Sequence, residues 1–213
     1  MKNGSNIQSI VFVIEDDASV QAALRELFES VGLQVEPFAS GESFLSSNHP
    51  DATSCLLVDV RLPGMSGLKV QEELAKTKIH MPIIFLTGYG DIPMAVRAIK
   101  SGAVDFLTKP VRNQDLLDAV AVALEQDRTR RAKEHSHSTL RKRFKLLSQR
   151  EQDVVARVAA GGLNKQIAAD LGVSEVTVKV HRSHAMRKLG LKSVAELVRI
   201  ADLLDVAAPA KVN

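Results

Sequence analysis

Residues 55–67 read CLLVDVRLPGMSG, and this stretch decides the fold of the first half of the chain. The apolar run Cys55–Val58 is typical of a strand that is buried on both faces of a parallel sheet. It ends in Asp59, and turn residues follow before the amphipathic pattern of 66–77 begins. Because ligands of open parallel sheets bind beyond the carboxyl ends of the strands, Asp59 lies where a site is expected.

Short apolar runs and amphipathic stretches alternate through the first 125 residues. Five repeats of strand then helix imply right-handed crossovers and a parallel sheet that helices cover on both faces. The expected fold class is therefore α/β, with a five-stranded, doubly wound sheet. The expected strands are 10–14, 35–38, 55–58, 83–86 and 104–107, and the expected helices are 18–31, 41–47, 66–77, 93–100 and 113–126.

The charge balance changes sharply near residue 126. Residues 1–125 carry 10 Lys and Arg against 16 Asp and Glu, a net charge of −6, whereas residues 126–213 carry 18 against 9, a net charge of +9. A basic half indicates a polyanion as its partner, although surface charge for solubility is the simpler explanation. The expected organisation is a first domain over 1–125, a charged linker over 126–146 that extends the fifth helix, and an all-helical domain over 147–213.

The cysteine count and the hydropathy of the sequence indicate the cellular compartment in which the protein is expected. Cys55 is the single cysteine, which excludes an internal disulfide framework and fits a reducing compartment. Its apolar neighbours indicate a buried structural thiol and not a nucleophile. The N-terminal region lacks the pattern of a secretory signal, and no segment approaches the length of a membrane span. The sequence therefore predicts a cytoplasmic protein with no membrane partner.

The carboxyl ends of four expected strands carry groups that suit phosphoryl chemistry. Clustered carboxylates repel unless a cation or proton neutralises them, and an all-oxygen site suits Mg²⁺ better than zinc or copper. A carboxylate beside Mg²⁺ that faces a lysine and a threonine can attack a phosphoryl group, whose charge the metal and the lysine stabilise. The residues are Glu15, Asp16 and Asp17 after the first strand, Asp59 after the third, Thr87 after the fourth, and Lys109 with Pro110 after the fifth.

Taken singly, these residues have ordinary structural explanations. Asp17 can cap the helix that follows it, Thr87 beside Gly88 can be a turn residue, and Lys109 can be a surface lysine. Their joint occurrence at successive strand ends favours one shared site.

The same segments resemble the receiver domain of two-component response regulators over about residues 8–126. The resemblance implies a flavodoxin-like fold in which Asp59 accepts a phosphoryl group from a phosphohistidine of a sensor histidine kinase. The segments that carry it are Glu15-Asp16-Asp17, Asp59 to Gly67, Thr87-Gly88 and Lys109-Pro110.

The resemblance also implies a role for each residue of the site. Asp16 binds Mg²⁺ directly with Asp59, Glu15 acts through water, and Arg61 contributes its backbone carbonyl. Lys109 contacts the phosphate, and the peptide bond before Pro110 is cis. The implied switch pair is Thr87, which moves toward the phosphate, and Phe106, which then swings inward.

Two positions depart from the family pattern. Glu15 stands where the family mostly has Asp, and Phe106 stands where it often has Tyr, so that this ring cannot donate a hydrogen bond when exposed. A plain core aromatic is the alternative for Phe106. Arg61 and Tyr89 flank the site, and we hypothesise that they shield it from hydrolytic water.

The second half contains the pattern of a helix-turn-helix. Asn164 to Leu171 predicts one helix, Gly172-Val-Ser174 a turn with an N-cap serine, and Glu175 to Leu189 a second helix. The expected inner face of the second helix contains Val176, Val180 (in part), Ala185 and Leu189. Its exposed basic face can enter a DNA groove, although an ordinary amphipathic helix with a solvated basic face has the same pattern.

The wider sequence, over about 143–205, resembles the LuxR-type domain of NarL/FixJ regulators, with FixJ and StyR nearest in appearance. The segments that carry the resemblance are Leu147 to Glu151, Asn164 to Ala168, Val173 to Arg182 and Met186 to Gly190. It implies that Lys179, Val180 and Ser183 face bases, and that Thr177, Arg182 and Lys188 hold phosphates. It further implies a dimerising last helix whose stripe is Val194, Leu197, Val198 and Ala201, with packing against the domain's own core as the alternative.

The expected function is that of a two-component response regulator. Phosphorylated on Asp59, it dimerises and binds promoter DNA to regulate, and by its likeness to FixJ to activate, transcription with RNA polymerase as a partner. No enzymatic activity beyond autophosphatase activity is expected. One alternative is a phosphorylation-independent DNA-binding regulator with a vestigial receiver. Another is a metal-dependent phosphatase or dehalogenase, but this class usually has a second Asp two residues after the first, where this chain has Arg61.

Overall fold

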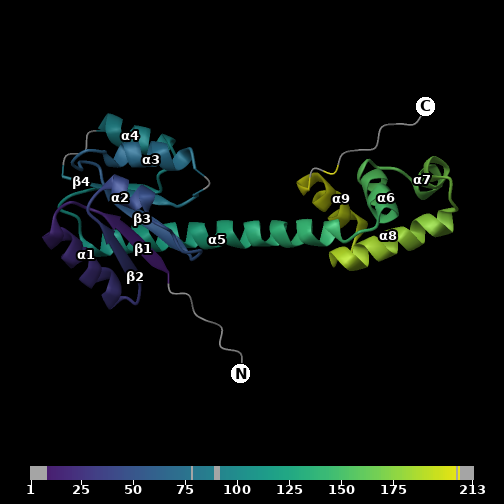
Figure 1. Ribbon diagram of the computed structural model, residues 1–213, viewed down its shortest axis with the longest axis horizontal. Coiled ribbons are helices and arrows are strands. Elements are labelled where there is room, and N and C mark those ends of the chain that lie inside the picture. Colours follow the sequence, from purple (N-terminus) through teal and green to yellow (C-terminus); the bar gives the residue numbers. More distant parts are fainter. Residues whose placement is uncertain (1–8, 78, 89–91, 205, 207–213) are drawn as a thin grey trace, which may run out of the picture. The chain divides into compact units, whose positions relative to one another are not determined.

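The computed structural model of the chain describes residues 9–77, 79–88, 92–204 and 206 (Figure 1). The chain divides into two compact units, Met1–Arg131 and Ala132–Asn213. The first unit contains strands and helices and the second contains helices, as the sequence predicts. Within the described residues, no helix is both long enough and apolar enough to cross a bilayer.

The first unit is built on a five-stranded sheet in the order β2-β1-β3-β4-β5, with every neighbouring pair parallel. This arrangement confirms the predicted fold class, and the predicted strand boundaries differ from the observed ones by at most one residue. The strands are β1 (Ile10–Ile14), β2 (Gln34–Phe38), β3 (Ser54–Asp59), β4 (Ile83–Thr87) and β5 (Asp105–Thr108).

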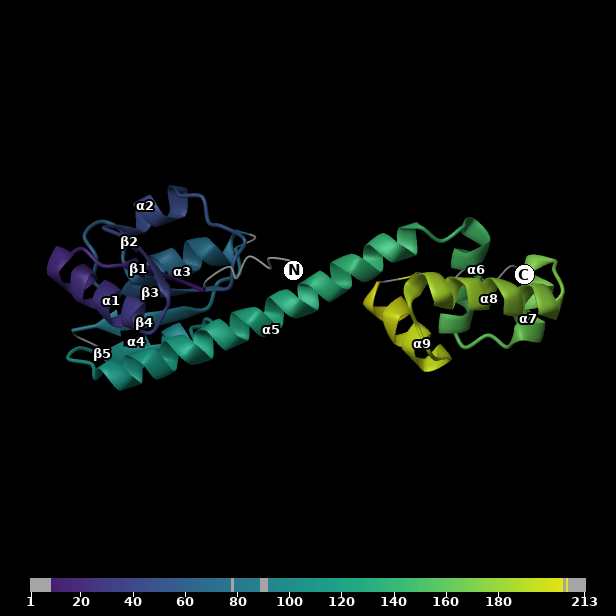
Figure 2. The ribbon, with the colours of Figure 1, turned by 90° about the horizontal axis from the view of Figure 1, so that it is seen from below.

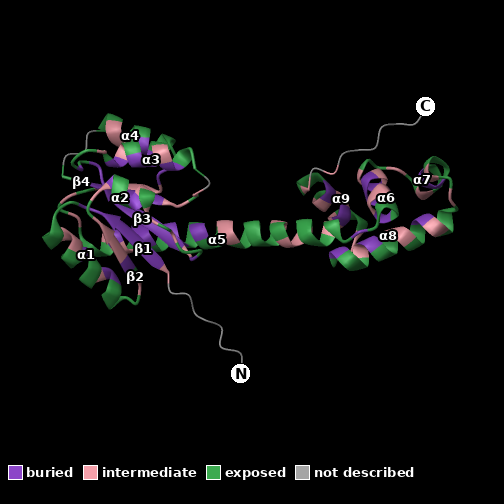
Figure 3. Cartoon of the chain, in the orientation of Figure 1, coloured by how far each residue is buried: buried purple, intermediate pink, exposed green. Residues whose placement is uncertain are grey.

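Helices cover both faces of this sheet, so that β1, β3 and β4 are buried along their whole length (Figure 3). Alternate side chains of each strand enter two separate cores. Phe12 packs with residues of α2, α3 and α4 on one face, and Val11 packs with residues of α1 and α5 on the other. The helices are α1 (Ala18–Ser30), α2 (Gly41–Ser46), α3 (Gly67–Ala75), α4 (Ile92–Lys100) and α5 (Asn113–Lys145).

Helix α5 continues without a break for 33 residues, which confirms the predicted extension of the fifth helix. Its first part packs on the sheet, and this packing reaches past the predicted domain end at 125, because Asp127 is buried. Residues 132–136 are exposed (Figure 3). Phe144 and, just beyond the helix, Leu147 pack into the core of the second unit.

Four helices, α6 to α9, gather around one apolar core in the second unit (Figures 1 and 2). Helices α6, α8 and α9 each begin after a serine whose side chain accepts a hydrogen bond from an N–H of the first turn. Ser148 and Glu151 form a reciprocal capping box at α6, and Ser174 caps α8. Gly172 has φ of 65° at the end of α7, a conformation that favours glycine and turns the chain into α8. The helices are α6 (Gln149–Ala159), α7 (Asn164–Leu171), α8 (Glu175–Leu189) and α9 (Val194–Leu203).

Candidate phosphoacceptor site and DNA-binding face

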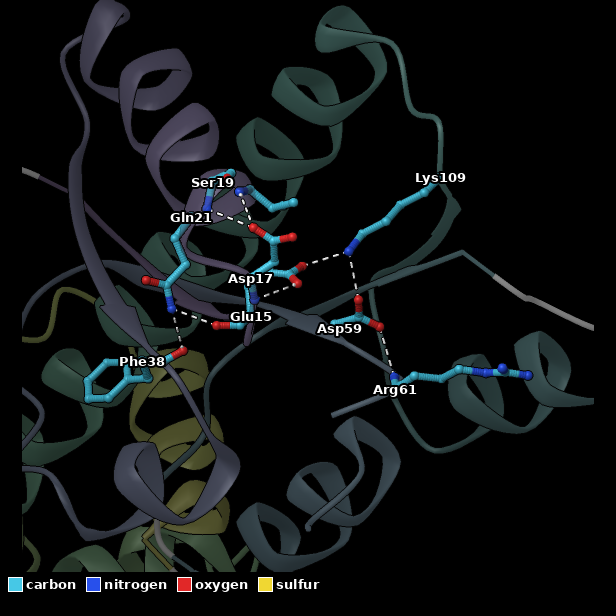
Figure 4. A network of polar contacts seen from close by, with 9 residues as sticks. Glu15, Asp17, Ser19, Gln21, Phe38, Asp59, Arg61 and Lys109 are labelled. Carbon is cyan, nitrogen blue, oxygen red and sulfur yellow. Dashed lines mark hydrogen bonds and ion pairs between the residues drawn. The ribbon is translucent and has the colours of Figure 1, made fainter. Parts of the chain in front are cut away.

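Three charged side chains from three strand ends meet at the carboxyl edge of the sheet (Figure 4). Lys109 Nζ lies 2.6 Å from Glu15 Oε2 and 2.6 Å from Asp59 Oδ2. Glu15 is 3% exposed and Asp59 is 8% exposed, so water solvates neither carboxylate freely. Glu15, Asp59 and Lys109, which are separated by 44 and 50 positions in the sequence, therefore form one compact group, as the strand-end argument predicts. We call this group the acidic cluster.

The sheet topology explains this convergence. β1 and β3 are neighbours with Ile14 opposite Val58, which places Glu15 beside Asp59. β4 follows on the other side of β3, and the backbone N–H of Lys109 donates to the carbonyl of Thr87 at 2.7 Å. The peptide bond between Lys109 and Pro110 is cis, as the family resemblance implies.

One backbone N–H and the ammonium of Lys109 hold the carboxylate of Asp59 in place. The N–H of Arg61 donates to Asp59 Oδ1 at 2.8 Å, so that both oxygens of Asp59 accept a hydrogen bond. Gly67 begins α3 against the same strand, and a Cβ added at Gly67 would lie 2.4 Å from the backbone oxygen of Asp59. Glycine is therefore required where α3 approaches the strand end, which explains its place in the quoted motif.

A glutamine outside the predicted set also fixes the strand ends. The amide of Gln21 donates to the backbone carbonyls of Glu15 at 2.6 Å and Phe38 at 3.0 Å (Figure 4). It thereby joins α1 to the ends of β1 and β2. Spacing in the sequence gave no sign of this role, because the contact depends on the crossing of α1 over the sheet.

The electrostatics of the cluster favour a further cation. Burial raises the pKa of Glu15, and the nearby Asp59 carboxylate raises it further, although Lys109 opposes both effects. Burial lowers the pKa of Lys109, but hydrogen bonds from its ammonium to Asp59 and Glu15 outweigh this and leave the pKa raised. One ammonium thus faces two buried carboxylates, and the donors are all oxygen. This set fits a hard divalent cation such as Mg²⁺.

Asp16 and Asp17 differ from Glu15 in their surroundings. Asp16 is exposed beside the cluster. Asp17 is the N-cap of α1, because its Oδ1 accepts from the N–H groups of Ser19 at 2.7 Å and Val20 at 3.3 Å, and these bonds lower its pKa. The capping alternative for Asp17 is therefore confirmed. With Lys109 between the carboxylates, no three His, Cys, Asp or Glu side chains lie together as metal ligands in the part of the chain that the structure describes.

The expected switch residues lie on neighbouring strands next to this cluster. Thr87 ends β4 and is fully buried. Phe106, on β5, is half-buried, packs against the core on the α4 face of the sheet, and has its ring centroid 6.1 Å from that of Phe85. Arg61 is exposed at the rim of the site, as a shielding residue requires. Tyr89, the other residue of the shielding hypothesis, lies outside the described residues.

The three residues predicted to face bases form an open surface on α8. Lys179, Val180 and Ser183 are all exposed, and the exposed fraction of Val180 is 45%. Lys179 forms no ion pair with any residue in the described ranges of the chain. These side chains are thus available to an external partner.

The three residues predicted to hold phosphates already contact their own domain. Thr177 Oγ1 lies 2.8 Å from Ser174 Oγ, and Arg182 Nη1 donates to Asn164 Oδ1 at 3.1 Å. Lys188 Nζ donates to Glu151 Oε2 at 2.7 Å, and Glu151 is 3% exposed. Lys188 therefore fixes the end of α8 to the start of α6. The Ser-x-x-Glu capping pattern at 148–151 could have identified Glu151 from the sequence.

The prediction of the buried face of α8 is wrong at two positions. Val176 is 68% exposed and Val180 is 45% exposed, whereas Val178 is fully buried. The buried stripe is Val178, Ala185 and Leu189, which are spaced by seven and four residues and so lie on one side of a helix with 3.6 residues per turn. Val176 and Val180 lie on the opposite side.

The four residues expected to form a dimerisation stripe on α9 are divided between the core of the domain and its surface. Leu197 is fully buried and Ala201 is 2% exposed, and both belong to the core of their own domain, so neither can face a second chain. This corrects their assignment to a dimer face and follows the packing alternative. Val194 is 39% exposed and Val198 is half-buried, and these two remain accessible.

Two protein families match successive parts of the chain. The family described as "Response regulator receiver domain" matches residues 11–121, and the family described as "Bacterial regulatory proteins, luxR family" matches residues 145–201. The acidic cluster and the sheet from Val11 onward lie within the first range, and α6 to α9 begin within the second. The chain belongs to the response regulators, with a receiver domain followed by a luxR-type DNA-binding domain.

Similar proteins match along nearly the whole chain. Nodulation protein W of Bradyrhizobium diazoefficiens is 53% identical over 204 residues, which are 96% of this chain and 90% of that protein. Response regulator protein TodT of Pseudomonas putida is 46% identical over 96% of this chain and 90% of its own length. The solved structure of response regulator StyR is 45% identical with a TM-score of 0.79, and covers 92% of this chain and 98% of that one. The chain is thus a two-component response regulator that acts as a transcriptional regulator, and its partner classes are a sensor kinase and DNA.

Proposed function

We propose that Asp59 accepts a phosphoryl group from a phosphohistidine of a sensor histidine kinase, and that this reaction controls DNA binding by α8. The observation that carries the proposal is the position of Lys109 Nζ, 2.6 Å from both Asp59 and Glu15. It places a cation beside the one strand-end carboxylate of β3 at the edge of the sheet where ligands of this fold class bind.

The residues divide the chemistry of transfer among them. An oxygen of Asp59 attacks phosphorus and forms the O–P bond, the P–N bond to the imidazole breaks, and the released imidazole takes a proton from solvent. The ammonium of Lys109 stabilises the negative charge on the transferring oxygens, and it is already oriented by two carboxylates. The N–H of Arg61 keeps the carboxylate of Asp59 oriented while one of its oxygens reacts.

Mg²⁺ is the cofactor that the carboxylates fit. Asp16, Asp59 and the backbone carbonyl of Arg61 would hold it, with Glu15 acting through water. When bound, it supplies positive charge that offsets the carboxylates and the incoming phosphoryl group. Burial, and to a smaller extent the nearby Asp59 carboxylate, raise the pKa of Glu15, so its charged form is costly in this site and a bound cation would stabilise it.

Phosphorylation then shifts a two-state equilibrium of the receiver. The hydroxyl of Thr87 donates to the phosphoryl group, and Phe106 fills the space that Thr87 leaves. The shifted state favours a homodimer, in which Val194 and Val198 lie at the contact of the DNA-binding domains. Lys179, Val180 and Ser183 then face bases at the promoter, where the dimer activates RNA polymerase. The phosphoryl group must favour one state by a few kcal/mol to matter, and a preference of about 5.5 kcal/mol would move the population completely, from 1:99 to 99:1.

The test uses the full chain with acetyl phosphate and Mg²⁺. The wild type should gain the mass of one phosphoryl group, the gain should disappear with hydroxylamine, and the protein should dimerise and bind promoter DNA more tightly. Asp59→Asn, which keeps size and polarity, should show none of these changes. Glu29→Gln, an exposed carboxylate on α1 of the same domain, is the matched control and should behave as the wild type. Equal labelling of Asp59→Asn would overturn the proposal, and equal DNA affinity with and without label would favour a phosphorylation-independent regulator.

A further inference from the structure

A buried carboxylate lies at the opposite edge of the sheet from the acidic cluster. Asp127, in the middle of α5, is fully buried, and it is one of few charged side chains buried among the described residues. Its sequence neighbours are Gln126 and Arg128, both exposed, so the local composition predicts a solvated linker. Neither phosphoryl transfer nor DNA binding uses this group.

The carboxylate of Asp127 joins a strand to a helix. Its Oδ2 accepts from the backbone N–H of Ser54, the first residue of β3, at 3.0 Å. Ser54 is 1% exposed, so water cannot replace Asp127 as the partner of this N–H. A buried N–H that loses its partner is costly, which makes the contact hard to open.

Two arginines on the same face of α5 complete the cluster. Arg130 Nη2 lies 2.5 Å from Asp127 Oδ1, and Arg131 Nε lies 2.6 Å from Asp127 Oδ2. Arg131 also pairs with Asp51 in the loop before β3. Positions 127, 130 and 131 are spaced by three and four residues, so their side chains project from one side of the helix. Arg128 points elsewhere and pairs with the exposed Glu125.

We infer that Asp127 is a positioning residue, which fastens the start of the linker helix to the amino end of β3. The carboxyl end of the same strand is Asp59. β3 is buried along its whole length and paired on both sides, so it moves as one rigid element. Residues 126–131 are thus part of the receiver body, and a shift of β3 at Asp59 reaches the linker through Ser54 and Asp127.

This inference rests in part on the proposed function, because the signal that β3 carries is phosphorylation of Asp59. The attachment itself is independent of phosphorylation and can be measured in the resting protein. The two parts therefore need separate readouts.

The first experiment measures the attachment by amide hydrogen exchange of the full, unphosphorylated chain. In Asp127→Asn the charge that holds both arginines is lost, and the bond from the Ser54 N–H passes from a carboxylate to a neutral amide oxygen and weakens. Amides of 128–134 should exchange about tenfold faster than in the wild type, because the helix opens locally more often. Arg128→Ala, which removes an exposed pair one residue away, should leave these rates unchanged. Asp51→Asn, a surface change that cannot disturb the core, should raise these exchange rates by about twofold. It removes only the ion pair between Asp51 and Arg131, and the pairs of Asp127 with both arginines remain.

The second experiment measures coupling as the ratio of DNA affinities with and without acetyl phosphate. Typical coupling between two sites is about 5- to 150-fold, and Asp127→Asn should reduce this ratio to about twofold or less. The extent of phosphorylation of the variant, followed by intact mass, should match the wild type. Arg128→Ala should keep the full ratio.

The outcomes separate the two ideas. Unchanged exchange of 128–134 in Asp127→Asn overturns the attachment, and faster exchange with an unchanged affinity ratio overturns the positioning role. If the wild type gains no phosphoryl mass, the proposed function fails and so does the signalling part of the inference, whereas the exchange comparison still decides the attachment. Faster exchange together with a reduced ratio supports the whole inference.

Discussion

The acidic cluster of the receiver and helix α8, which we propose reads DNA, hold their candidate functional side chains in different ways. In the cluster, Lys109 lies 2.6 Å from both Glu15 and Asp59, and these two carboxylates are buried. On α8, Lys179 and Ser183 are exposed, and only Lys188 is fixed by a buried partner, Glu151.

The difference follows from what each site must bind. A phosphoryl group is small and reacts, so the groups around it are oriented in advance and their charges are strengthened by burial. DNA is large, and its phosphates attract exposed cations through water, which permits mobile side chains. Removal of a residue should therefore affect chemistry most in the cluster, whereas on α8 it should affect either binding or stability.

The largest expected effect is that of Lys109→Ala on phosphorylation. Loss of one oriented charge near a transition state typically lowers the rate about 100- to 1000-fold, and we expect a reduction in this range with acetyl phosphate. Intact mass followed over time gives the rate. Lys76→Ala, which removes an exposed lysine paired with Glu73, is the control and should leave it unchanged. If Lys109→Ala were phosphorylated at the wild-type rate, the oriented charge of the acidic cluster would not contribute to the reaction, and the contrast with α8 would fail.

A second substitution tests how closely the cluster is packed. Gly67→Ala should lower the free energy of unfolding of the receiver by about 1–3 kcal/mol, because the new Cβ would meet the backbone oxygen of Asp59. Protection of β3 amides in native-state hydrogen exchange reports this free energy for the receiver alone. Gly88→Ala is the matched control, since a Cβ there meets nothing within 4 Å. Equal protection in the two variants would show that α3 adjusts without strain.

A pair of substitutions on α8 separates binding from stability. Lys188→Met should destabilise the DNA-binding domain by about 1–2 kcal/mol, since it leaves the buried Glu151 without its cation. Lys179→Met should change stability by less than about 0.5 kcal/mol. Exchange protection of α6 amides and titration of promoter DNA give the two quantities. Lys179→Met should weaken DNA binding by about 1–3 kcal/mol and relax base preference, as expected for a residue that faces bases. If Lys188→Met weakened DNA binding without loss of stability, and Lys179→Met did the opposite, Lys188 would again be expected to contact DNA.

The smallest expected effect is a pH dependence from Glu15. Its folded-state pKa is raised above the ordinary value of 4.5, mainly by burial, so the folded protein holds this proton more tightly than the unfolded chain. Stability from this group is therefore greatest near or below that value and declines as the pH rises through the folded pKa. Without Mg²⁺, Glu15→Gln should melt at a higher temperature than the wild type near neutral pH, and the difference should shrink toward pH 4.5. A difference that grows on acidification would contradict the raised pKa.

The candidate site could be predicted from the sequence because strand ends are easy to find. Apolar runs such as Ile10–Ile14 and Cys55–Val58 fix the strands, and parallel topology places their carboxyl ends at one edge. Glu15, Asp59, Thr87 and Lys109 all lie there in the structure. The roles of Gln21 and Gly67 could not be predicted, since each depends on how a helix crosses the sheet.

Helix surfaces were harder to interpret. Valines at 176, 178 and 180 are chemically equivalent in sequence, and only the packing of α8 shows that Val178 is the buried one. The apolar stripe of α9 likewise contains residues of the core, such as Leu197, beside accessible ones, such as Val194. Apolar character at helical spacing identifies a buried face, but not which surface buries it.

The sequence by itself determined the two-part organisation, the order of strands and helices, and the chemistry at the strand ends, because these depend on local patterns of polarity and charge. Tertiary structure alone decided which charges are paired. Lys109 bridges two carboxylates, Lys188 holds Glu151, and Asp127 holds the start of β3. Each of these contacts joins residues more than thirty positions apart, and whether a charge faces water or a buried partner depends on the packing that brings such residues together.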